Sequence, residues 1–416
     1  MVLLTADAAT AAPARADAAR WEMAAAALCL AQVSEPLFAA IAQSQGLADP
    51  PGYARVFFLP VYAFLAFVIW RDRALAWTAL RATPLLTALL GLAALSALWS
   101  IDSGASVRRA VWLGATMALG LYLAWRYRWR DLALVIAGAF ALLIAASFAT
   151  ALLAPAVGRM TFEHPGAWSG LWTHKNTLGG FMALGLPACL AAAWLDAKHR
   201  RLWALAALGA FALVLLSTSK TALLASALGV AVIGAGALMR RGPVPTLLTL
   251  SAAAIAAIAA LAITLLAPDL LVAAIGRDLT LTGRTEIWDA SARFVEARPW
   301  LGYGYYAFWL PENGPAYWVR EAVNWQVASA HSGWLELALG LGRVGVVLFA
   351  LQMAGALRRS AGAVFRADAG LYAPALLAVF ALYTLSESHV LQANDLFWAI
   401  YVAVVARLAL DAKEAA

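Results

Sequence analysis

The sequence predicts an all-α polytopic integral membrane protein, and three observations lead to this fold class. Of its 416 residues, 64% are hydrophobic and 13% are charged, so a soluble protein could not cover its apolar surface with polar side chains. The apolar residues gather in runs of about 20, the length at which a helix crosses a bilayer. The two cysteines, Cys29 and Cys189, lie inside such runs and indicate neither a disulfide framework nor a metal site.

The apolar runs predict about twelve transmembrane helices and one long loop. Residues 1–267 hold the first nine helices, 268–330 form the loop, and 331–416 hold the last three helices. The tail before the first helix lacks the compact basic region of a secretory signal, and we expect it to be retained. The expected spans are 22–45, 54–70, 82–100, 107–124, 132–153, 177–195, 202–217, 221–239, 246–267, 332–357, 371–386 and 396–411.

Basic residues predict the orientation of these helices. With the N-terminus inside, most arginines and lysines of the loops lie on the inner side, as the positive-inside rule requires. Both termini are then cytoplasmic, and the 268–330 loop faces outward. The net charge of +7 reflects these inner loops, so we expect membrane lipids and no nucleic acid as partners. The short outer loops hold Arg55, Arg108, Arg109, Arg159, Lys175 and Lys220.

Titratable side chains converge on the outer face. A single lysine there is equally well explained as a snorkelling anchor near the lipid headgroups, but the convergence favours a binding site. The 268–330 loop carries more acids than arginines, so particular arginines in fixed geometry would have to bind an anion. The converging residues are Arg159, His164, His174, Lys175, Lys220, Arg284 and His331.

Within the loop, the stretch from Leu281 to Phe308 predicts an amphipathic helix that is capped near Thr282 and ended by Pro299. Its apolar stripe is suited to lie along the membrane surface. The aromatic rings that follow form either an interfacial belt or a wall on which sugar rings stack. The stripe consists of Ile287, Ser291, Phe294 and Val295, and the rings belong to Trp300, Tyr303, Tyr305, Tyr306, Phe308 and Trp309.

Three stretches, in this order, resemble the O-antigen ligase and polymerase superfamily of bacterial envelopes. They are THKNTLGGFMALGLP (173–187), GRTEIWDASARFVEARPWLGYGYYAF (283–308) and AHSGWLELALGLGRVGVVLF (330–349). The stretches WSIDSGASVRRA (99–110) and SES (386–388) are weaker matches. The closest resemblance is to lipopolysaccharide O-antigen ligases, and it implies a glycosyltransferase-C-like fold.

This resemblance implies an enzyme of lipopolysaccharide biosynthesis at the periplasmic face of the bacterial inner membrane. It implies transfer of O-antigen polysaccharide from undecaprenyl pyrophosphate to lipid A-core oligosaccharide, with inversion and without a metal or other cofactor. His331 and Arg284 would be essential, and Arg159 would match a further arginine before the HKN segment. An O-antigen polymerase of the same superfamily is the alternative, and a lipid or solute transporter is a more distant one.

The chemistry of this reaction agrees with these residue types. Negative charge on the leaving phosphate would be stabilised by Arg284, Arg159 and Lys175. Histidine is largely deprotonated near neutral pH, so His331 is suited to accept the proton of the acceptor hydroxyl. The competing interpretation makes His331 a helix cap. Further candidates are His174 and Lys220 for pyrophosphate binding, and Glu387 and His389 for supporting roles.

Overall fold

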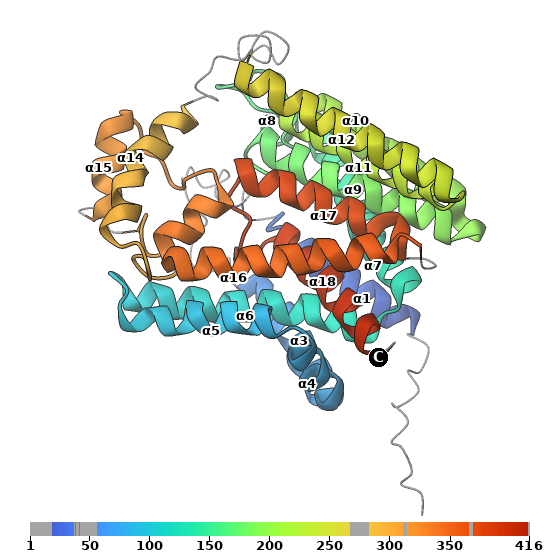
Figure 1. The fold of residues 1–416 in the computed structure, drawn as a ribbon, viewed down its shortest axis with the longest axis horizontal. Coiled ribbons are helices and arrows are strands. Elements are labelled where there is room, and N and C mark those ends of the chain that lie inside the picture. Colours follow the sequence, from blue (N-terminus) through green and yellow to red (C-terminus); the bar gives the residue numbers. More distant parts are fainter. Residues whose placement is uncertain are drawn as a thin grey trace, which may run out of the picture.

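The structure confirms the all-α prediction over the residues that it describes. This computed structural model describes residues 19–36, 38, 41, 56–266, 283–310, 314–365 and 369–414. The described elements are helices, apart from one isolated antiparallel bridge between Arg159 and Trp168. Figure 1 shows long helices side by side along the long axis, with α14 (Arg284–Ala297) and α15 (Pro315–Val323) at one end. We call this end the loop end.

From residue 103 onward, the helices follow the predicted apolar runs, with differences of a few residues at most ends. Before residue 103, the run 54–70 forms α3 (Leu59–Arg71), and the run 82–100 forms α5 (Pro84–Leu95) and the 3₁₀ turn η2 (Ser96–Leu98). These helices are α1 (Arg20–Gln32), α3 (Leu59–Arg71), α4 (Arg73–Ala82), α5 (Pro84–Leu95), η2 (Ser96–Leu98), α6 (Ser103–Arg126), α7 (Trp129–Leu153), α8 (Pro155–Gly158), α9 (Lys175–Leu195), η3 (Ala197–His199), α10 (Arg200–Leu216), α11 (Lys220–Met239), α12 (Pro243–Leu266), α16 (Gly333–Ala363), α17 (Ala369–Ser386) and α18 (Leu396–Glu414).

Among the described residues, five helices are long and apolar enough to cross a membrane. They are α7, α9, η3 together with α10, α11 and α16. A sixth span results if α4 and α5, which meet at a bend of 93°, form one broken span. These helices support a polytopic membrane protein, whereas the total of twelve spans and the side on which the long loop lies stay predictions.

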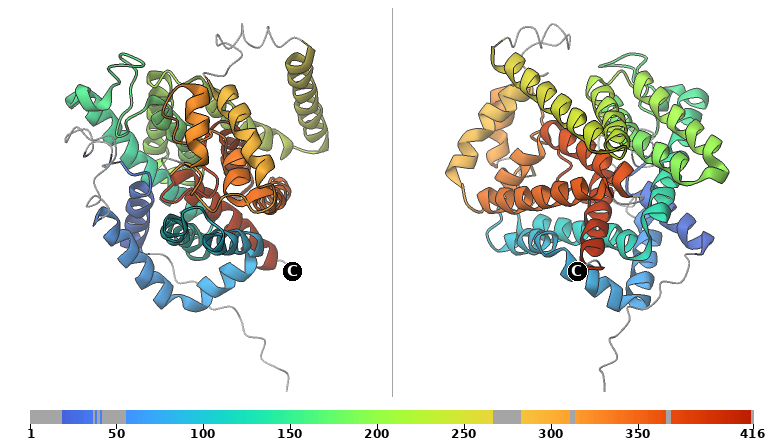
Figure 2. Two further views of the ribbon diagram at one scale, coloured as in Figure 1. Left: turned by 90° about the vertical axis from the view of Figure 1, so that its left-hand side faces the viewer. Right: turned by 45° about the vertical axis from the view of Figure 1, so that its right-hand side comes forward.

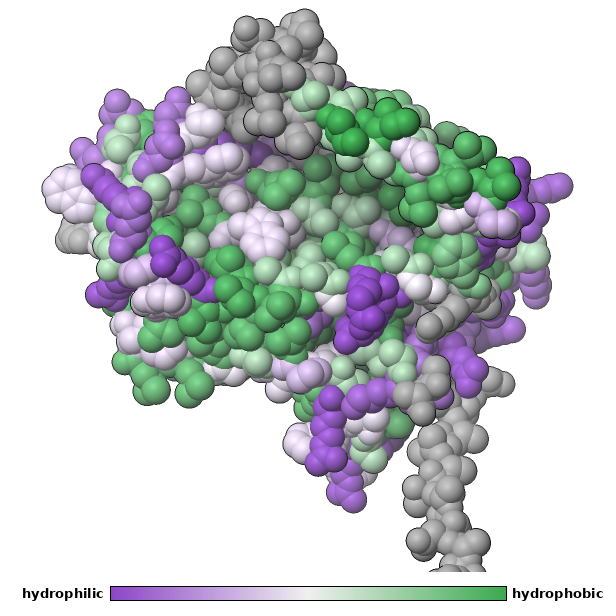
Figure 3. Space-filling view, viewed as in Figure 1, coloured by the Kyte–Doolittle hydropathy of each residue, from purple (hydrophilic) through white to green (hydrophobic). Residues whose placement is uncertain are grey.

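The outward faces of α10, α11 and α12 are apolar. Leu205, Leu208, Leu224 and Leu247 are each more than half exposed. Figure 3 shows hydrophobic side chains spread over this part of the surface, and hydrophilic ones gathered near α14 and α15. Figure 2 shows α12 at the periphery of the bundle. By contrast, every side chain of α18 from residue 396 to residue 410 is buried. Apolar surface on this scale fits a lipid environment around a core built on α18.

The first predicted span, 22–45, does not form as one helix. α1 ends at Gln32, and Glu35 has a φ of 54°, in the left-handed region, directly before Pro36. The α conformation is disfavoured before proline, and the proline ring cannot continue a helix. Glu35 therefore lies at a break in the chain, and most of the predicted span beyond Pro36 lies outside the described residues.

α14 confirms the predicted amphipathic helix and corrects its surroundings. It ends at Ala297, before Pro299, whereas Thr282 lies outside the described residues. Ile287 and Ser291 of its stripe are buried, because the stripe packs on protein and not along a membrane surface. The small core that includes Ile287 consists of Ile287, Tyr303, Phe308, Trp309, Ala316, Val319, Val327, Ala330 and Leu339.

Most of the aromatic stretch after α14 is neither a membrane belt nor a sugar-binding wall. Tyr303, Tyr305, Phe308 and Trp309 are each less than one tenth exposed, so their rings pack inside the protein. Trp300 differs, with an exposed fraction of 64%, and is available for either role.

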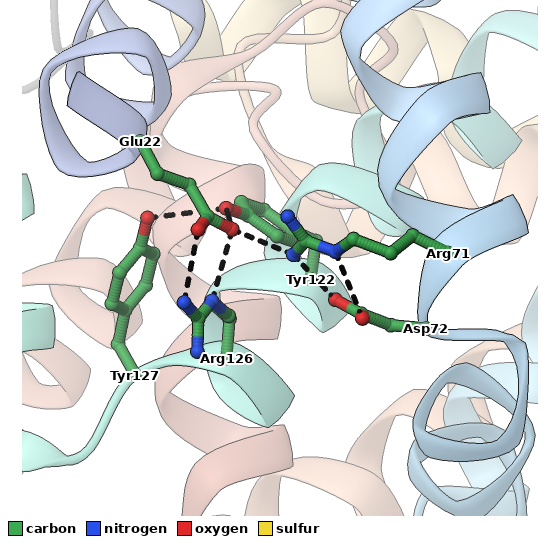
Figure 4. A network of polar contacts seen from close by, with 6 residues as sticks. All are labelled: Glu22, Arg71, Asp72, Tyr122, Arg126 and Tyr127. Atoms are coloured by element: carbon green, nitrogen blue, oxygen red, sulfur yellow. Dashed lines mark hydrogen bonds and ion pairs between the residues drawn. The ribbon is translucent and has the colours of Figure 1, made fainter. Parts of the chain in front are cut away.

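At the end of the bundle opposite the loop end, Glu22 joins α1 to α3 and α6 (Figure 4). Glu22 is only 2% exposed and accepts hydrogen bonds from Arg126 at 2.9 Å, from Arg71 at 2.7 Å and from the Tyr122 hydroxyl at 2.8 Å. Because α6 has 24 residues, its two ends lie about 36 Å apart. We call this set the Glu22 network; it consists of Glu22, Arg71, Asp72, Tyr122, Arg126 and Tyr127.

Candidate active site

The loop end contains a cavity of about 740 Å³ that is lined by charged and polar side chains. Its walls come from the segment before α9, the starts of α9, α11 and α14, and the chain on either side of His331 and Glu387. Seven of the eight predicted site residues line it: His174, Lys175, Lys220, Arg284, His331, Glu387 and His389. The residues that no pattern predicted include Thr218, Asn176, Trp325, Tyr383 and Phe397.

Glu387 joins the two residues that the resemblance makes essential. Its Oε1 accepts a hydrogen bond from Arg284 at 2.7 Å, and its Oε2 lies 3.3 Å from His331 Nδ1. Burial favours the neutral acid, but the hydrogen bond from His331 and the charge of Arg284 hold the pKa of Glu387 below its ordinary value. Three groups that are far apart in the sequence are therefore joined through one carboxylate, and we call this unit the Glu387 bridge.

The Glu387 bridge determines which nitrogen of His331 can act as a base. An ionised carboxylate only accepts hydrogen bonds, so His331 Nδ1 carries the proton that Glu387 binds. In the neutral ring, Nε2 then keeps its lone pair. A carboxylate on one nitrogen and a lone pair on the other is the arrangement that a histidine base requires.

The backbone of the AHSGW stretch is held from two sides. Ala330 N donates to Glu336 at 2.5 Å, and Ala330 O accepts from Trp288 Nε1 of α14 at 2.9 Å. His331 itself has a φ of 48°, a left-handed conformation that a non-glycine residue keeps only when its surroundings impose it. The helix cap of α16 comes from Ser332, whose side chain accepts from Leu335 N. Ser332 therefore takes the capping role that was the alternative for His331.

Two helices begin at the cavity with a lysine. α9 starts at Lys175 and α11 at Lys220, and both lysines line the cavity. Lys175 is only 7% exposed, and its Nζ donates to Thr218 Oγ1 at 3.2 Å. Helix N-termini carry partial positive charge and unpaired N–H groups. This wall is therefore suited to an anion.

Glu163, His164 and His174 each place a ligand atom within 4.8 Å of the others, a set able to hold a divalent metal such as zinc. His174 Nδ1 accepts from the backbone N–H of Asn176 at 3.2 Å, so the neutral ring carries its proton on Nε2. This nitrogen faces Glu163 at 3.6 Å. A metal on Nε2 would replace that proton and leave Nδ1 protonated, so Nδ1 could no longer accept the hydrogen bond that caps α9. These contacts therefore fit a histidine–carboxylate pair better than a metal site. Burial lowers the pKa of His174 and favours the neutral ring.

A second carboxylate orients His389. Asp395, at the start of α18, accepts from Trp398 N at 2.7 Å with one oxygen and lies 2.9 Å from His389 Nδ1 with the other. The imidazole also stacks on Phe397, with ring centroids 4.2 Å apart. Burial lowers the pKa of His389, but the charge and hydrogen bond of Asp395 outweigh burial, so the pKa lies above its ordinary value.

Arg159 is the one predicted site residue that does not line the cavity. Its Nε donates to Ala151 O at 3.0 Å, and its guanidinium lies over the Trp168 ring, 5.1 Å from the centroid. The structure therefore places this arginine in contact with its own neighbouring segments and outside the set of residues that line the cavity.

Comparison with known proteins agrees with the motifs. Residues 205–350, which include Arg284 and His331, match a family model described as O-antigen ligase. The chain is also 27% identical over 192 residues to the exopolysaccharide production protein ExoQ of Rhizobium meliloti (strain 1021). That match covers 44% of each protein, so the chain spans less than half the length of this relative. The predicted resemblance to the O-antigen ligase and polymerase superfamily is thereby confirmed, and the long apolar helices support a polytopic membrane protein.

Proposed function

We propose that the protein ligates O-antigen polysaccharide from undecaprenyl pyrophosphate onto lipid A-core oligosaccharide at the periplasmic face of the inner membrane. The observation that carries this proposal is the Glu387 bridge, which presents a histidine base and a guanidinium on the wall of one cavity. A superfamily of polysaccharide enzymes and a cavity of this size support a lipid-linked glycan as the substrate.

In the proposed reaction, the acceptor hydroxyl attacks the anomeric carbon of the donor sugar from the face opposite the pyrophosphate. The new glycosidic bond forms as the bond between that carbon and the pyrophosphate oxygen breaks, which inverts the configuration. The hydroxyl proton passes to His331 Nε2, and undecaprenyl pyrophosphate leaves with the electron pair. Help from such a base is worth about 10²–10⁴-fold in rate.

The charge of the leaving pyrophosphate would be stabilised by cations of the protein. Arg284 is fixed by Glu387 and has further N–H donors. Lys175, Lys220 and the N-termini of α9 and α11 form the anion-binding wall. Fixed cations of this kind are sufficient for the reaction without a divalent metal, and metal independence is part of the proposal. We assign Arg159 no contact with phosphate because it lies outside the cavity wall.

A polymerase, in which a growing glycan is the acceptor, is the second candidate. One observation favours it: the relative ExoQ is described as an exopolysaccharide production protein and not as a ligase. Deletion in the native bacterium distinguishes the two functions. Loss of a ligase leaves bare lipid A-core and accumulates lipid-linked polymer, whereas loss of a polymerase leaves single repeat units on the core.

Reconstitution tests the enzymatic proposal directly. The purified full chain is combined with undecaprenyl pyrophosphate-linked glycan and core lipid, with a metal chelator and without ATP. We expect glycan-bearing lipid A-core from the wild-type protein and none from His331→Ala or Arg284→Ala. Product that survives one of these changes would remove that residue from the mechanism, and the absence of product from the wild-type protein would contradict the enzymatic proposal.

A further inference from the structure

The wall of the cavity contains a buried hydroxyl with no hydrogen-bond partner among the described residues. Tyr383 lines the cavity and is only 2% exposed, yet its Oη is unpaired. The hydroxyl lies against Gly180 of α9, where an added Cβ would be 3.2 Å away. A buried polar group without a partner costs free energy, so an unpaired hydroxyl in a cavity wall indicates a ligand atom that completes it.

His389 lies beside Tyr383 in the same wall. The two ring centroids are 5.8 Å apart, and both rings pack against Phe397. Asp395 accepts from His389 Nδ1, and Asp395 and Glu387 together favour the charged form of the imidazole. Protonated His389 therefore has a second N–H, on Nε2, in addition to the one that Asp395 binds.

These two side chains offer donors, and their surroundings favour an anion. The tyrosine O–H needs an acceptor, and so does the Nε2–H that His389 gains when its ring is protonated. A phosphoryl oxygen is an acceptor that carries no proton of its own. Tyr383 lies within electrostatic range of both Glu387 and Arg284, which are paired with each other. The first turns of α9, with Lys175 at its start, lie next to the hydroxyl and favour negative charge.

We propose that Tyr383 and His389 form a phosphate-binding pair for a prenyl pyrophosphate, and that Asp395 is the positioning residue of His389. This inference deepens the proposed function, on which its physiological ligand rests. Glu387 does not repel the phosphate at full strength because the guanidinium of Arg284 neutralises its charge. Asn176 Oδ1, a second unpaired buried atom of the cavity wall, is an acceptor and suits a hydroxyl of the donor sugar.

Direct binding tests the inference without requiring any transfer. The purified full chain in detergent is titrated with farnesyl pyrophosphate, and farnesol serves as the matched ligand without phosphate. We expect Tyr383→Phe and His389→Gln each to weaken farnesyl pyrophosphate binding by about tenfold, and Asp395→Asn to weaken it to a similar extent. Binding of farnesol should stay unchanged in all three variants.

Tyr401→Phe is the matched control for the loss of a buried hydroxyl. Tyr401 is also a buried tyrosine, with Gln352 beside its Oη, but it lies within α18 and does not line the cavity. We expect this variant to bind farnesyl pyrophosphate as the wild type does. The inference is overturned if Tyr383→Phe and His389→Gln bind farnesyl pyrophosphate normally, or if farnesol binding falls equally. Wild-type binding without glycan transfer would instead overturn the proposed function alone.

Discussion

Two glutamates, one at each end of the bundle, bind arginines in ways that differ in one respect. Glu22 is 2% exposed and accepts from Arg71, Arg126 and the Tyr122 hydroxyl (Figure 4). Glu387, whose side chain is 20% exposed, contacts Arg284 and His331 beside a large cavity. The Glu22 network joins helices, whereas the Glu387 bridge leaves a histidine nitrogen available to a ligand.

This difference indicates how to separate a structural ion pair from a functional one. Both glutamates bind guanidiniums, so an ion pair with arginine does not by itself distinguish them. The distinguishing feature is whether the partners of the carboxylate keep unused hydrogen-bonding capacity that faces a cavity. Changes at the loop end should therefore reduce turnover, and changes in the Glu22 network should reduce stability.

The largest effect is expected from His331→Ala. The variant loses the proposed base, and glycan transfer in the reconstituted system should fall by about 10²–10⁴-fold. Its thermal unfolding should stay close to that of the wild type, because the cap of α16 comes from Ser332. Full activity in this variant would contradict the functional role of the Glu387 bridge.

Glu22→Ala should act on the fold instead. Removing one partner of a buried ion pair leaves the other charges uncompensated, at a cost of about 3 kcal/mol in the free energy of unfolding. Turnover per folded molecule should be unchanged, because Glu22 lies far from the cavity. Denaturant unfolding and a transfer assay on the same preparation measure both quantities. A lower turnover at unchanged stability would contradict the structural role.

Glu387→Gln is the matched change at the loop end. Glutamine has nearly the same shape but can donate to His331 Nδ1, which would move the ring proton to Nε2 and remove the base. We expect transfer to fall on the order of 10²-fold with a smaller loss of stability than in Glu22→Ala. If this variant keeps its activity, Glu387 does not select the His331 tautomer.

The pH dependence of stability gives a finer test of the Glu387 bridge. The pKa of Glu387 in the folded protein lies below its ordinary value, so its stabilising contribution is present above about pH 4.3, the ordinary glutamate pKa. It is lost as the pH falls through the lowered pKa. The difference in melting temperature between wild type and Glu387→Gln should be present at pH 5, where Glu387 is still ionised, and shrink in more acidic buffer. A constant difference at every pH would argue against an ionised bridge.

The smallest effect is expected from Arg159→Ala. Its guanidinium bonds to Ala151 O and covers Trp168, outside the cavity wall. We expect transfer within about threefold of the wild type and a loss of stability of about 1 kcal/mol. A large loss of transfer at unchanged stability would restore this arginine to the pyrophosphate site that the motif suggested.

Sequence patterns predicted the helices well where one long apolar run determines the element. α7 and α11 match their predicted spans closely because nothing interrupts those runs. The first span failed at Glu35 and Pro36, where a proline ends the helix that hydropathy alone would continue. The break can be predicted from the proline in the sequence, but the left-handed backbone conformation of Glu35 cannot.

The candidate site was predictable in its residue types and only in part in its contacts. The motifs brought His331, Arg284 and Glu387 to one face, but the bridge between them depends on how α14 packs against the end of α17. Tyr383 reads as one more apolar residue of a span, and Asp395 as a helix cap. The place of Tyr383 in the cavity wall follows from contacts between helices that are distant in the chain, which periodicity does not describe.

The proposed mechanism gives the chain order of the Glu387 bridge a consequence for biosynthesis. A translating ribosome produces Arg284 and His331 well before Glu387, so a nascent chain in the translocon contains the base and the guanidinium without the carboxylate that aligns them. Chemistry on an activated glycan would then begin only once α17 is inserted. Incomplete chains would then neither hydrolyse the lipid-linked glycan nor transfer it to a wrong acceptor.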